Sequence, residues 1–522
     1  MGSTQAVPGQ PGTGTQADPD EVAGDAVETT AAALVLPGST PAGSGGGAAA
    51  GGSAAAAAAR GEGPADGPGL VTDEAGDGPG VASAAPAGGP VVAGSGAATA
   101  TDAEDEAAAK RAALAGELFA PGVGAQAGPP RTPARATAVQ PGASSAGGHS
   151  HGPGERPRAE RFTSRNPDAF GVPTGREEEW RFTPLARMRD LLEPLELSDP
   201  PKVTVDAPDG VEVRTIAGDA EPVGSVLVPA DRVSALAMER VRQAMLVTVP
   251  KGTTLTDPVT ITVSGAGEKA YAHLFVDVKP FSEAVVILDH VGSATLAANV
   301  ELRVGDGASL TLVTVQDWAP DAVHVAAHAA EVGRDARLRH AVVTFGGDLV
   351  RISPTVRYTG PGGDVDLLGL SFADAGQHQE ARLYVDHAVP HCKSRVTYKG
   401  ALQGREAHTV WIGDVRIRAT GTQTDTYELN RNLLLTDGAR ADSVPNLEIE
   451  TGEVAGAGHA SATGRFDDEQ LFYLMARGIP QLEARRLVVR GFFADVIKRI
   501  GQPAITERLT AAVEAELAAV GA

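Results

Sequence analysis

Short apolar runs rich in Val, Ile, Leu and Thr follow one another from about residue 203 to residue 449, and Gly, Asp or Pro interrupts them every several residues. Such runs are typical of β-strands bounded by turns, and the spacing leaves no room for crossover helices. Over roughly 250 residues, this pattern fits a pair of sandwiches, a barrel or a β-solenoid. The clearest runs are Ser225–Val228, Ala244–Val249, Val259–Val263, Ala272–Val278, Ala284–Leu288 and Ser309–Val315.

Compact turn sequences bear on the choice among these β folds. Gly305-Asp306-Gly307 and Gly360-Pro361-Gly362 form tight corners, which favour a solenoid slightly. The sequence has no strict hexapeptide or nonapeptide repeat, which argues against a left-handed hexapeptide helix or a calcium-loaded repeat array. Periodicity alone leaves the choice open.

The apolar spacing changes on both sides of the β region. Arg176–Leu192 has spaced apolar residues and acids at its start, which predicts short helices interrupted at Pro184. Beyond Arg465 the pattern predicts a compact set of three helices. The first begins at Asp467–Glu469 and closes at Gly478–Pro480, the second spans about Leu482–Ile500, and the third about Ile505–Val520.

Residues 1–148 are dominated by Ala, Gly, Pro, Ser and Thr, with an alanine run at Ala54–Ala59. Such a stretch buries too little apolar surface to offset the entropy of ordering its backbone. We therefore divide the chain into four parts. They are a disordered low-complexity extension (1–148), an N-terminal helical segment (149–202), a β core (203–464) and a C-terminal helical domain (465–522).

The formal net charge is -22, and residues 1–148 contribute about -10 of it through 15 acidic and 5 basic residues. The sequence has no stripe rich in Lys and Arg. Nucleic-acid binding depends on neutralising phosphates with such residues, so we expect no nucleic-acid partner.

Cys392 is the only cysteine. An intramolecular disulfide is therefore excluded, the chain cannot build a Cys-rich zinc or cluster site alone, and a reducing compartment is favoured. The N-terminus lacks the basic and apolar regions of a signal peptide, and no run of about 18 apolar residues occurs. We expect a cytoplasmic protein with no membrane partner.

The histidines invite a metal interpretation, and one group of them lies close to the single thiol. His387, His391 and His408 surround Cys392 in the sequence. Side chains alternate along a strand, so His391 and Cys392 would point to opposite faces. Packing is therefore the favoured interpretation over a ligand cluster.

Three further histidines are candidates for metal binding. His149 and His151 lie in a Gly/Ser-rich context without a third ligand, which predicts weak binding. His459 is surrounded by the small residues of Ala455–Thr463. It fits either a strand-end histidine with close neighbours or a metal ligand that needs further ligands from another chain.

Several separated motifs occur in the C-terminal third and near Trp180. They are Gly175–Thr183, Ser443–Ile449, Gly458–Ala460, Asp468–Leu474, Arg477–Ile479 and Gly491–Phe493. In this order they resemble the SufB/SufD family of iron–sulfur cluster assembly proteins, from about Arg161 to the C-terminus. The resemblance implies a mainly β fold, with a right-handed parallel β-helix core flanked by small N- and C-terminal α-helical domains.

Two positions within these motifs indicate the SufD branch of the family. SufB-like chains carry a cysteine shortly after the proline of the Ser443–Ile449 motif and a glutamate directly after the histidine. Ile449 and Ala460 stand there in this chain, and neither can bind a metal. Some relatives also carry a cysteine where Ala457 stands. His459 is the retained candidate ligand.

The resemblance therefore implies a non-catalytic scaffold subunit that pairs with a SufB-like subunit. A chain with one cysteine must borrow thiolates to hold a cluster. No cofactor is expected to be held stably by this chain alone. The family implies a transient iron–sulfur cluster at the interface, to which His459 would contribute, and reduced flavin in the complex.

The resemblance also implies that a SufC-like ATPase docks on the helical end domain. Its ATP-driven dimerisation would move the helices, and a stiff solenoid would transmit the motion to the subunit interface. We expect the docking surface to include the helices Leu471–Ile479 and Ala484–Ile497. The candidate contacts are Phe472, Tyr473, Arg477, Gly478 and Phe492.

Two other function classes remain open. A solenoid polysaccharide lyase or hydrolase predicts secretion and clustered catalytic acids beside a basic residue, and the missing signal peptide argues against it. The sequence also lacks a serine elbow, HExxH, GxGxxG and a P-loop. An interaction module unrelated to cluster assembly would purify without SufB or SufC.

Overall fold

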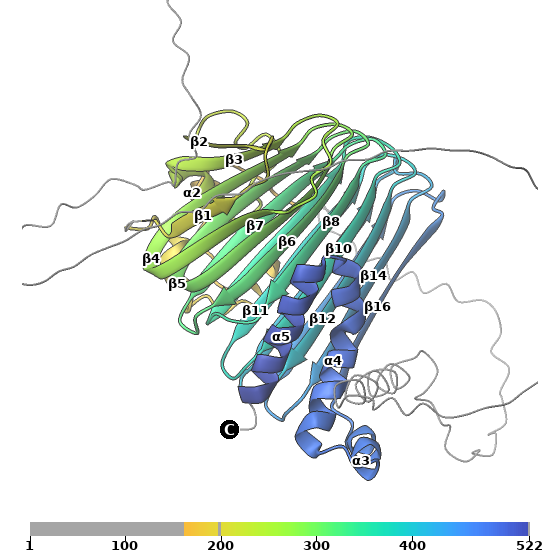
Figure 1. Cartoon of the computed structure of the whole chain (residues 1–522). Helices are drawn as coiled ribbons and strands as arrows, with labels where there is room; N and C mark the ends of the chain where they lie inside the picture. The colour runs from red at the N-terminus through yellow and green to blue at the C-terminus, as the bar shows by residue number, and fades with distance from the viewer. Residues whose placement is uncertain (1–160, 197–199, 520–522) are drawn as a thin grey trace, which may run out of the picture. The chain divides into compact units, whose positions relative to one another are not determined.

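The computed structural model describes residues 161–196 and 200–519. The predicted extension at 1–148 and the pair His149 and His151 lie outside the described residues. In the described part, the β region forms a parallel solenoid (Figure 1). From β6 to β14, each strand pairs in parallel with the strand two positions further along the chain.

This pairing places alternate strands in two facing sheets. The even sheet contains β6 (Ser309–Trp318), β8 (Arg337–Thr344), β10 (Asp364–Ala373), β12 (Lys393–Leu402), β14 (Asp425–Leu434) and β16 (Gly456–Arg465). The odd sheet contains β7 (Val323–Val332), β9 (Leu349–Tyr358), β11 (His378–His387), β13 (His408–Ile417) and β15 (Arg440–Ile449). Both sheets continue into the long strand β5 (Glu283–Val304), whose halves pair with β6 and β7.

The interior between the sheets is the main hydrophobic core. Leu310 and Leu367 of the even sheet meet Ile352 and Leu383 of the odd sheet there. Burial of such side chains stabilises the fold by roughly 1.5–3 kcal/mol each. The core thus links the two sheets along the solenoid.

Glycines close the corners where the chain passes between sheets. Gly292 separates the two halves of β5 with φ +81°, and a Cβ there would lie 2.1 Å from the carbonyl oxygen of Gly265. Gly307 and Gly362, in the predicted tight corners, also have positive φ. The solenoid prediction is therefore confirmed over a barrel or a sandwich.

One of the predicted strands is wrong. Ser225–Val228 does not form a strand, because the backbone N–H groups of Val226 and Leu227 bind the carboxylate of Glu301 instead of a neighbouring strand. The runs Val259–Val263 and Ala272–Val278 are real but belong to one long strand, β4 (Val259–Val278).

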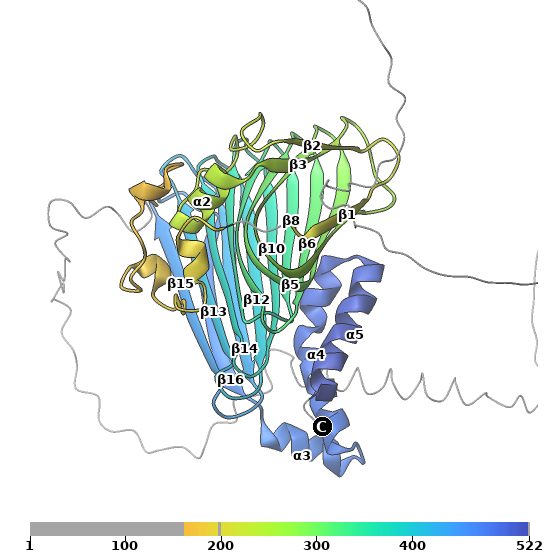
Figure 2. The same ribbon diagram turned by 90° about the vertical axis from the view of Figure 1, so that its left-hand side faces the viewer.

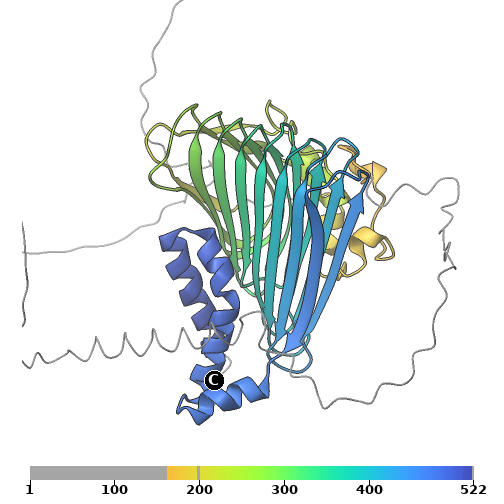
Figure 3. The same cartoon turned by 90° about the vertical axis from the view of Figure 1, so that its right-hand side faces the viewer.

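The two ends of the solenoid differ. At the first end, β1 (Lys202–Asp206) pairs antiparallel with β4, while β3 (Gln243–Val249) pairs with both β2 (Glu212–Ala217) and β4. In the described residues, β15 pairs only with β13 and β16 only with β14. The last turn therefore presents two unpaired strand edges, seen at the near side of Figure 3.

The N-terminal segment covers the odd sheet together with helix α2 (Arg232–Arg240) (Figure 2). The short helices expected around Pro184 are 3₁₀ turns, and Trp180 and Leu191 pack on Val325 and Leu349. Their bounds are η2 (Glu178–Trp180) and η3 (Arg189–Leu192), and a further 3₁₀ turn, η1 (Pro167–Ala169), precedes them.

The three predicted C-terminal helices are present as α3 (Asp468–Ala476), α4 (Gln481–Ile500) and α5 (Pro503–Ala519). Helix α4 lies on the outer face of the even sheet, where Val489 and Phe493 belong to the same cluster as Leu370. Lys399 of β12 also donates to the carbonyl oxygen of Phe492 at 2.6 Å. The helices thus share a core with the solenoid. None of the described helices is both long and apolar enough to cross a membrane.

Candidate functional site at the open end of the solenoid

His459 lies on β16, the last strand of the even sheet, and its side chain is exposed. Its direct neighbour in the parallel ladder is Glu428 of β14. Neighbouring strands lie about 4.8 Å apart, and paired residues of a parallel ladder point to the same face. The structure therefore places an imidazole beside a carboxyl group that sequence reasoning did not single out.

This shared face is the interior of the solenoid. Asn432, four residues beyond Glu428 on the same strand, donates to Asn430 at 2.8 Å and reaches Ser443 of the odd sheet at 3.3 Å. Ser443 also donates to Asn430. These side chains connect the two sheets in the last turns, and Glu428 and His459 lie on the same interior face, nearer the starts of their strands.

The carboxyl group of Glu428 is buried without a partner. Glu428 is 1% exposed, and neither of its carboxylate oxygens accepts a hydrogen bond. Burial, with a smaller contribution from Asp414, raises the pKa of Glu428 to about 8. A Cβ at Gly413 of the opposite sheet would lie 2.5 Å from Glu428 Oε1, so the carboxyl group occupies the space that this glycine leaves.

Ile449 and Ala460 border the same turn. Ile449 ends β15 and is 44% exposed, while Ala460 follows His459 on β16. No group of three or more His, Cys, Asp or Glu side chains in the described residues could hold a metal ion. His459 and Glu428 do supply nitrogen and oxygen donors that suit iron, so the last turn fits half of such a site.

The histidines around Cys392 do not form a ligand cluster. His387 is buried with Nε2 2.9 Å from Ser394 Oγ, whereas His391 lies at an exposed corner with φ +60°. Cys392 is fully buried, and burial raises the pKa of its thiol. His408 belongs to a different group on the outer face of the odd sheet.

That group is a buried polar network that the sequence did not reveal. Arg351 Nε donates to Glu380 at 3.1 Å, and the other oxygen of Glu380 lies 3.1 Å from His378 Nε2. His378 Nδ1 lies 3.1 Å from His408 Nδ1, and His408 Nε2 lies 2.7 Å from Asp442 on the edge strand β15. The chain of contacts crosses four neighbouring strands.

The network contains acids beside a basic residue, as a polysaccharide-cleaving site would. Arg351 and Glu380 are nevertheless almost completely buried beneath the N-terminal segment, where Glu179 also pairs with Arg351 at 2.7 Å. Burial opposes ionisation of Glu380, yet Arg351 and His378 hold its pKa down to about 2. A mutually paired, covered cluster serves the packing of the N-terminal segment.

The predicted SufC contacts fall into two environments. Phe472 is 72% exposed, and Tyr473 is 40% exposed with the Arg477 guanidinium 4.3 Å from its ring centroid. Gly478 ends the helix with φ +82°. Phe492 is only 7% exposed because its ring packs between helix α4 and the solenoid. Phe492 therefore does not belong to the exposed surface, which corrects that choice of residue.

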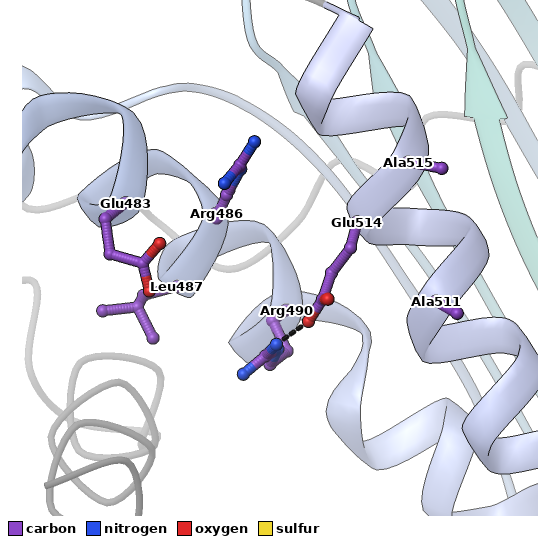
Figure 4. Close-up of a pocket in the computed structure, with 7 residues that line it drawn as sticks. All are labelled: Glu483, Arg486, Leu487, Arg490, Ala511, Glu514 and Ala515. Atoms are coloured by element: carbon purple, nitrogen blue, oxygen red, sulfur yellow. Dashed lines mark ion pairs between the residues drawn. The ribbon is translucent and has the colours of Figure 1, made fainter. Parts of the chain in front are cut away.

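A charged groove lies between α4 and α5 (Figure 4). Its volume is about 500 Å³, and it is lined by Glu483, Arg486, Arg490 and Glu514 together with Leu487, Ala511 and Ala515. Arg490 pairs with Glu514 across the groove. The groove thus lies along α4, one of the two predicted docking helices.

The geometry defines a class of protein, a parallel β-solenoid with an open last turn that carries metal-binding types of side chain. Residues 261–492 match the family model "SUF system FeS cluster assembly, SufBD core domain". The chain is 57% identical over 369 residues to an iron–sulfur cluster assembly SufBD family protein of Mycobacterium bovis. The matched region covers 69% of this chain and 93% of that protein.

Two further relatives agree with this match. A SufBD family protein of Mycobacterium leprae is 53% identical over 365 residues, covering 68% of this chain and 93% of the relative. The SufD protein of Bacillus subtilis is 26% identical over 308 residues, and the match covers 55% of this chain and 68% of the relative. The chain belongs to the SufBD family of the SUF system for iron–sulfur cluster assembly, which confirms the resemblance seen in its motifs.

Proposed function

We propose that this chain is a non-catalytic, SufD-like scaffold subunit of a SufBCD-type complex that assembles iron–sulfur clusters in the cytoplasm. The observation that carries the proposal is the open last turn, in which His459 lies on β16, one of the two strands with an unpaired edge. The cluster is cargo, held transiently where this chain meets its partner. Family membership favours this function over a carbohydrate-active enzyme or an unrelated interaction module.

The SufB-like partner would bind the edges of β15 and β16. An unpaired edge presents free N–H and C=O groups, which are a template for pairing with another chain. Each of these strands is ten residues long, and Ile449 adds exposed apolar surface. The partner would supply the thiolates that hold the cluster. The only cysteine of this chain, Cys392, is buried at the corner that directly precedes β12, and it is far in sequence from His459.

The SufC-like ATPase would dock on α3 and the start of α4. Phe472, Tyr473, Met475 and Leu482 are all exposed large side chains within a short stretch of these helices. Arg477 adds a cation beside Tyr473. Exposed aromatic residues next to an arginine are a common composition for the centre of a protein interface.

Co-expression with the SufB- and SufC-like partners tests both surfaces. Ile449→Asp should lower recovery of the SufB-like subunit on an affinity tag, while the equally apolar and exposed Val228→Asp should not. Phe472→Glu should lower recovery of the SufC-like ATPase, by roughly thirtyfold if the residue is a hot spot worth about 2 kcal/mol. Unchanged recovery in both cases would remove the basis for the scaffold assignment.

The cofactor content of the complex is part of the same proposal. Iron and sulfide analysis of the purified complex should show a cluster that is lost with His459→Ala. Reduced flavin in the complex would be recognised by its absorbance after reoxidation. Normal cluster yield with His459→Ala would leave the scaffold role intact but remove His459 from it.

A further inference from the structure

Glu428 differs from the other buried carboxylates of the described residues. Glu301 accepts backbone N–H groups, Glu380 is paired with Arg351, and Asp231 accepts from the backbone of Ser234. Among the described residues, Glu428 is the only acid whose two carboxylate oxygens are both buried and without a hydrogen-bond partner. A buried polar group left unsatisfied costs about 1–3 kcal/mol.

A glycine of the odd sheet and a histidine of the next strand are the neighbours of the Glu428 carboxyl group. Gly413 faces it from the odd sheet, where any larger residue would collide with Glu428 Oε1. The next strand of the even sheet carries His459 in direct register. Beyond β16 no further described strand pairs, so His459 lies on the last strand of the even sheet and Glu428 on the strand before it.

A purely structural role explains this arrangement poorly. The inward positions of β14 are Thr426, Glu428, Asn430 and Asn432, and the other three all make side-chain hydrogen bonds. Trp411 lies beside the same glycine, and its buried Nε1 has no partner either, so the carboxyl group makes no hydrogen bond with the indole. A carboxyl group there is understandable if a cation occupies the space next to it.

Resting on the proposed function, we propose that Glu428 and His459 together form this chain's half of a binding site for ferrous iron. A carboxylate oxygen and an imidazole nitrogen from neighbouring strands are a donor pair suited to this divalent cation. Two ligands leave coordination positions open, and the SufB-like partner completes the site across the open edge. Glu428 thus acts directly on the metal and His459 is not the sole contribution of this subunit.

The test is an anaerobic titration of the complex between this chain and its SufB-like partner with Co²⁺, which reports its ligands through visible absorption, and with Fe²⁺. Glu428→Gln keeps the shape of the side chain and removes the carboxylate that would bind the metal. Its Co²⁺ affinity should fall at least tenfold, since even loss of a group that only orients a ligand costs about 10–100-fold. His459→Ala should show a loss of the same order.

Ser461→Ala is the matched control. Ser461 is two residues from His459 on the same face of β16 and is also exposed. This variant should bind Co²⁺ as the wild type does. Glu428→Met is a second variant that fills the same space without a strong ligand, and it should repeat the loss seen with Glu428→Gln.

The outcomes separate this inference from the proposed function. Wild-type Co²⁺ affinity and spectrum in a folded Glu428→Gln or Glu428→Met complex would overturn the role of Glu428, even if His459→Ala fails and partner recovery is normal. If the SufB-like partner is never recovered, the proposed function fails. The same titration on the full chain alone then decides whether Glu428 and His459 bind the cation, with loss in Glu428→Gln supporting the site and no change overturning it.

Discussion

Two buried glutamates, one close to each end of the solenoid, have opposite environments. Glu301, on β5, accepts backbone N–H groups of Val226 and Leu227 at 2.7 and 2.9 Å and lies 2.8 Å from His273 Nε2. Burial opposes its ionisation, but these hydrogen bonds lower its pKa. Glu428, on β14, has no such partner, and burial raises its pKa.

The difference follows from how each end is covered. Antiparallel strands cap the first turns, and the segment that contains Val226 covers the outer face of the sheet there, so the chain itself satisfies Glu301. The last turn has no cap among the described residues, and no described side chain bonds the oxygens of Glu428, which faces the solenoid interior close to this end. Repeat proteins usually require capping at both ends, so an uncapped turn indicates a binding surface.

The strongest contrast is expected in stability. Glu301→Ala leaves several buried N–H donors and His273 without an acceptor, and breaking a buried charged group of this kind costs about 3–5 kcal/mol. Urea denaturation should show a lower midpoint with an unchanged slope. Glu301→Gln retains one acceptor oxygen and should lose less. If Glu301→Ala lowered the free energy of unfolding by less than an ordinary surface substitution does, the segment that contains Val226 would not depend on this carboxylate.

Histidines extend the comparison to pH. His290 is buried in an early turn, its ring 4.8 Å from that of His324, whereas His459 is exposed. Burial lowers the pKa of His290 from 6.5 to about 4. The unfolded chain therefore binds more protons between pH 6.5 and about 4, so His290 makes the fold lose stability as the pH falls through this window.

His290→Phe should remove this dependence while retaining the ring packing against Trp318. The stability difference between the variant and the wild type should change by at most about 1.4 kcal/mol per pH unit in the window and stay constant above it. Urea denaturation at a series of pH values measures the difference. If the free energy of unfolding depended on pH equally in both proteins, His290 would already be protonated or accessible to solvent in the folded state.

The β runs and the tight corners at Gly307 and Gly362 were predictable because they are local, but they left sandwich, barrel and solenoid open, and the parallel β-helix came from the resemblance of the motifs. The strand predicted at Ser225–Val228 was wrong because Glu301, 75 residues further along the chain, accepts a hydrogen bond from the backbone N–H of Val226. The network from Arg351 to Asp442 was also hidden, because one turn advances the chain by 26 residues from Val323 to Leu349 but by 32 from His408 to Arg440. With an irregular repeat, polar residues that stack in space do not recur at a fixed interval.

The candidate site was predicted only in part. His459 was found through its motif, and Ile449 and Ala460 through the ligand atoms that they lack. Glu428 was missed, although Thr426, Glu428, Asn430 and Asn432 are polar at alternate positions, which indicates a strand with a polar interior face. Which strand lies next to His459 depends on the register of β14 and β16, and a single sequence does not reveal that register.

The smallest expected change in stability is at Glu428 itself. Because neither oxygen has a partner, Glu428→Gln breaks no hydrogen bond, and its free energy of unfolding should differ from the wild type by less than about 1 kcal/mol at neutral pH. Urea denaturation of the two Gln variants, at positions 301 and 428, makes the comparison directly. A loss at position 428 as large as at 301 would mean that Glu428 is held by partners within its own fold, and the contrast between the covered and the open end would no longer stand.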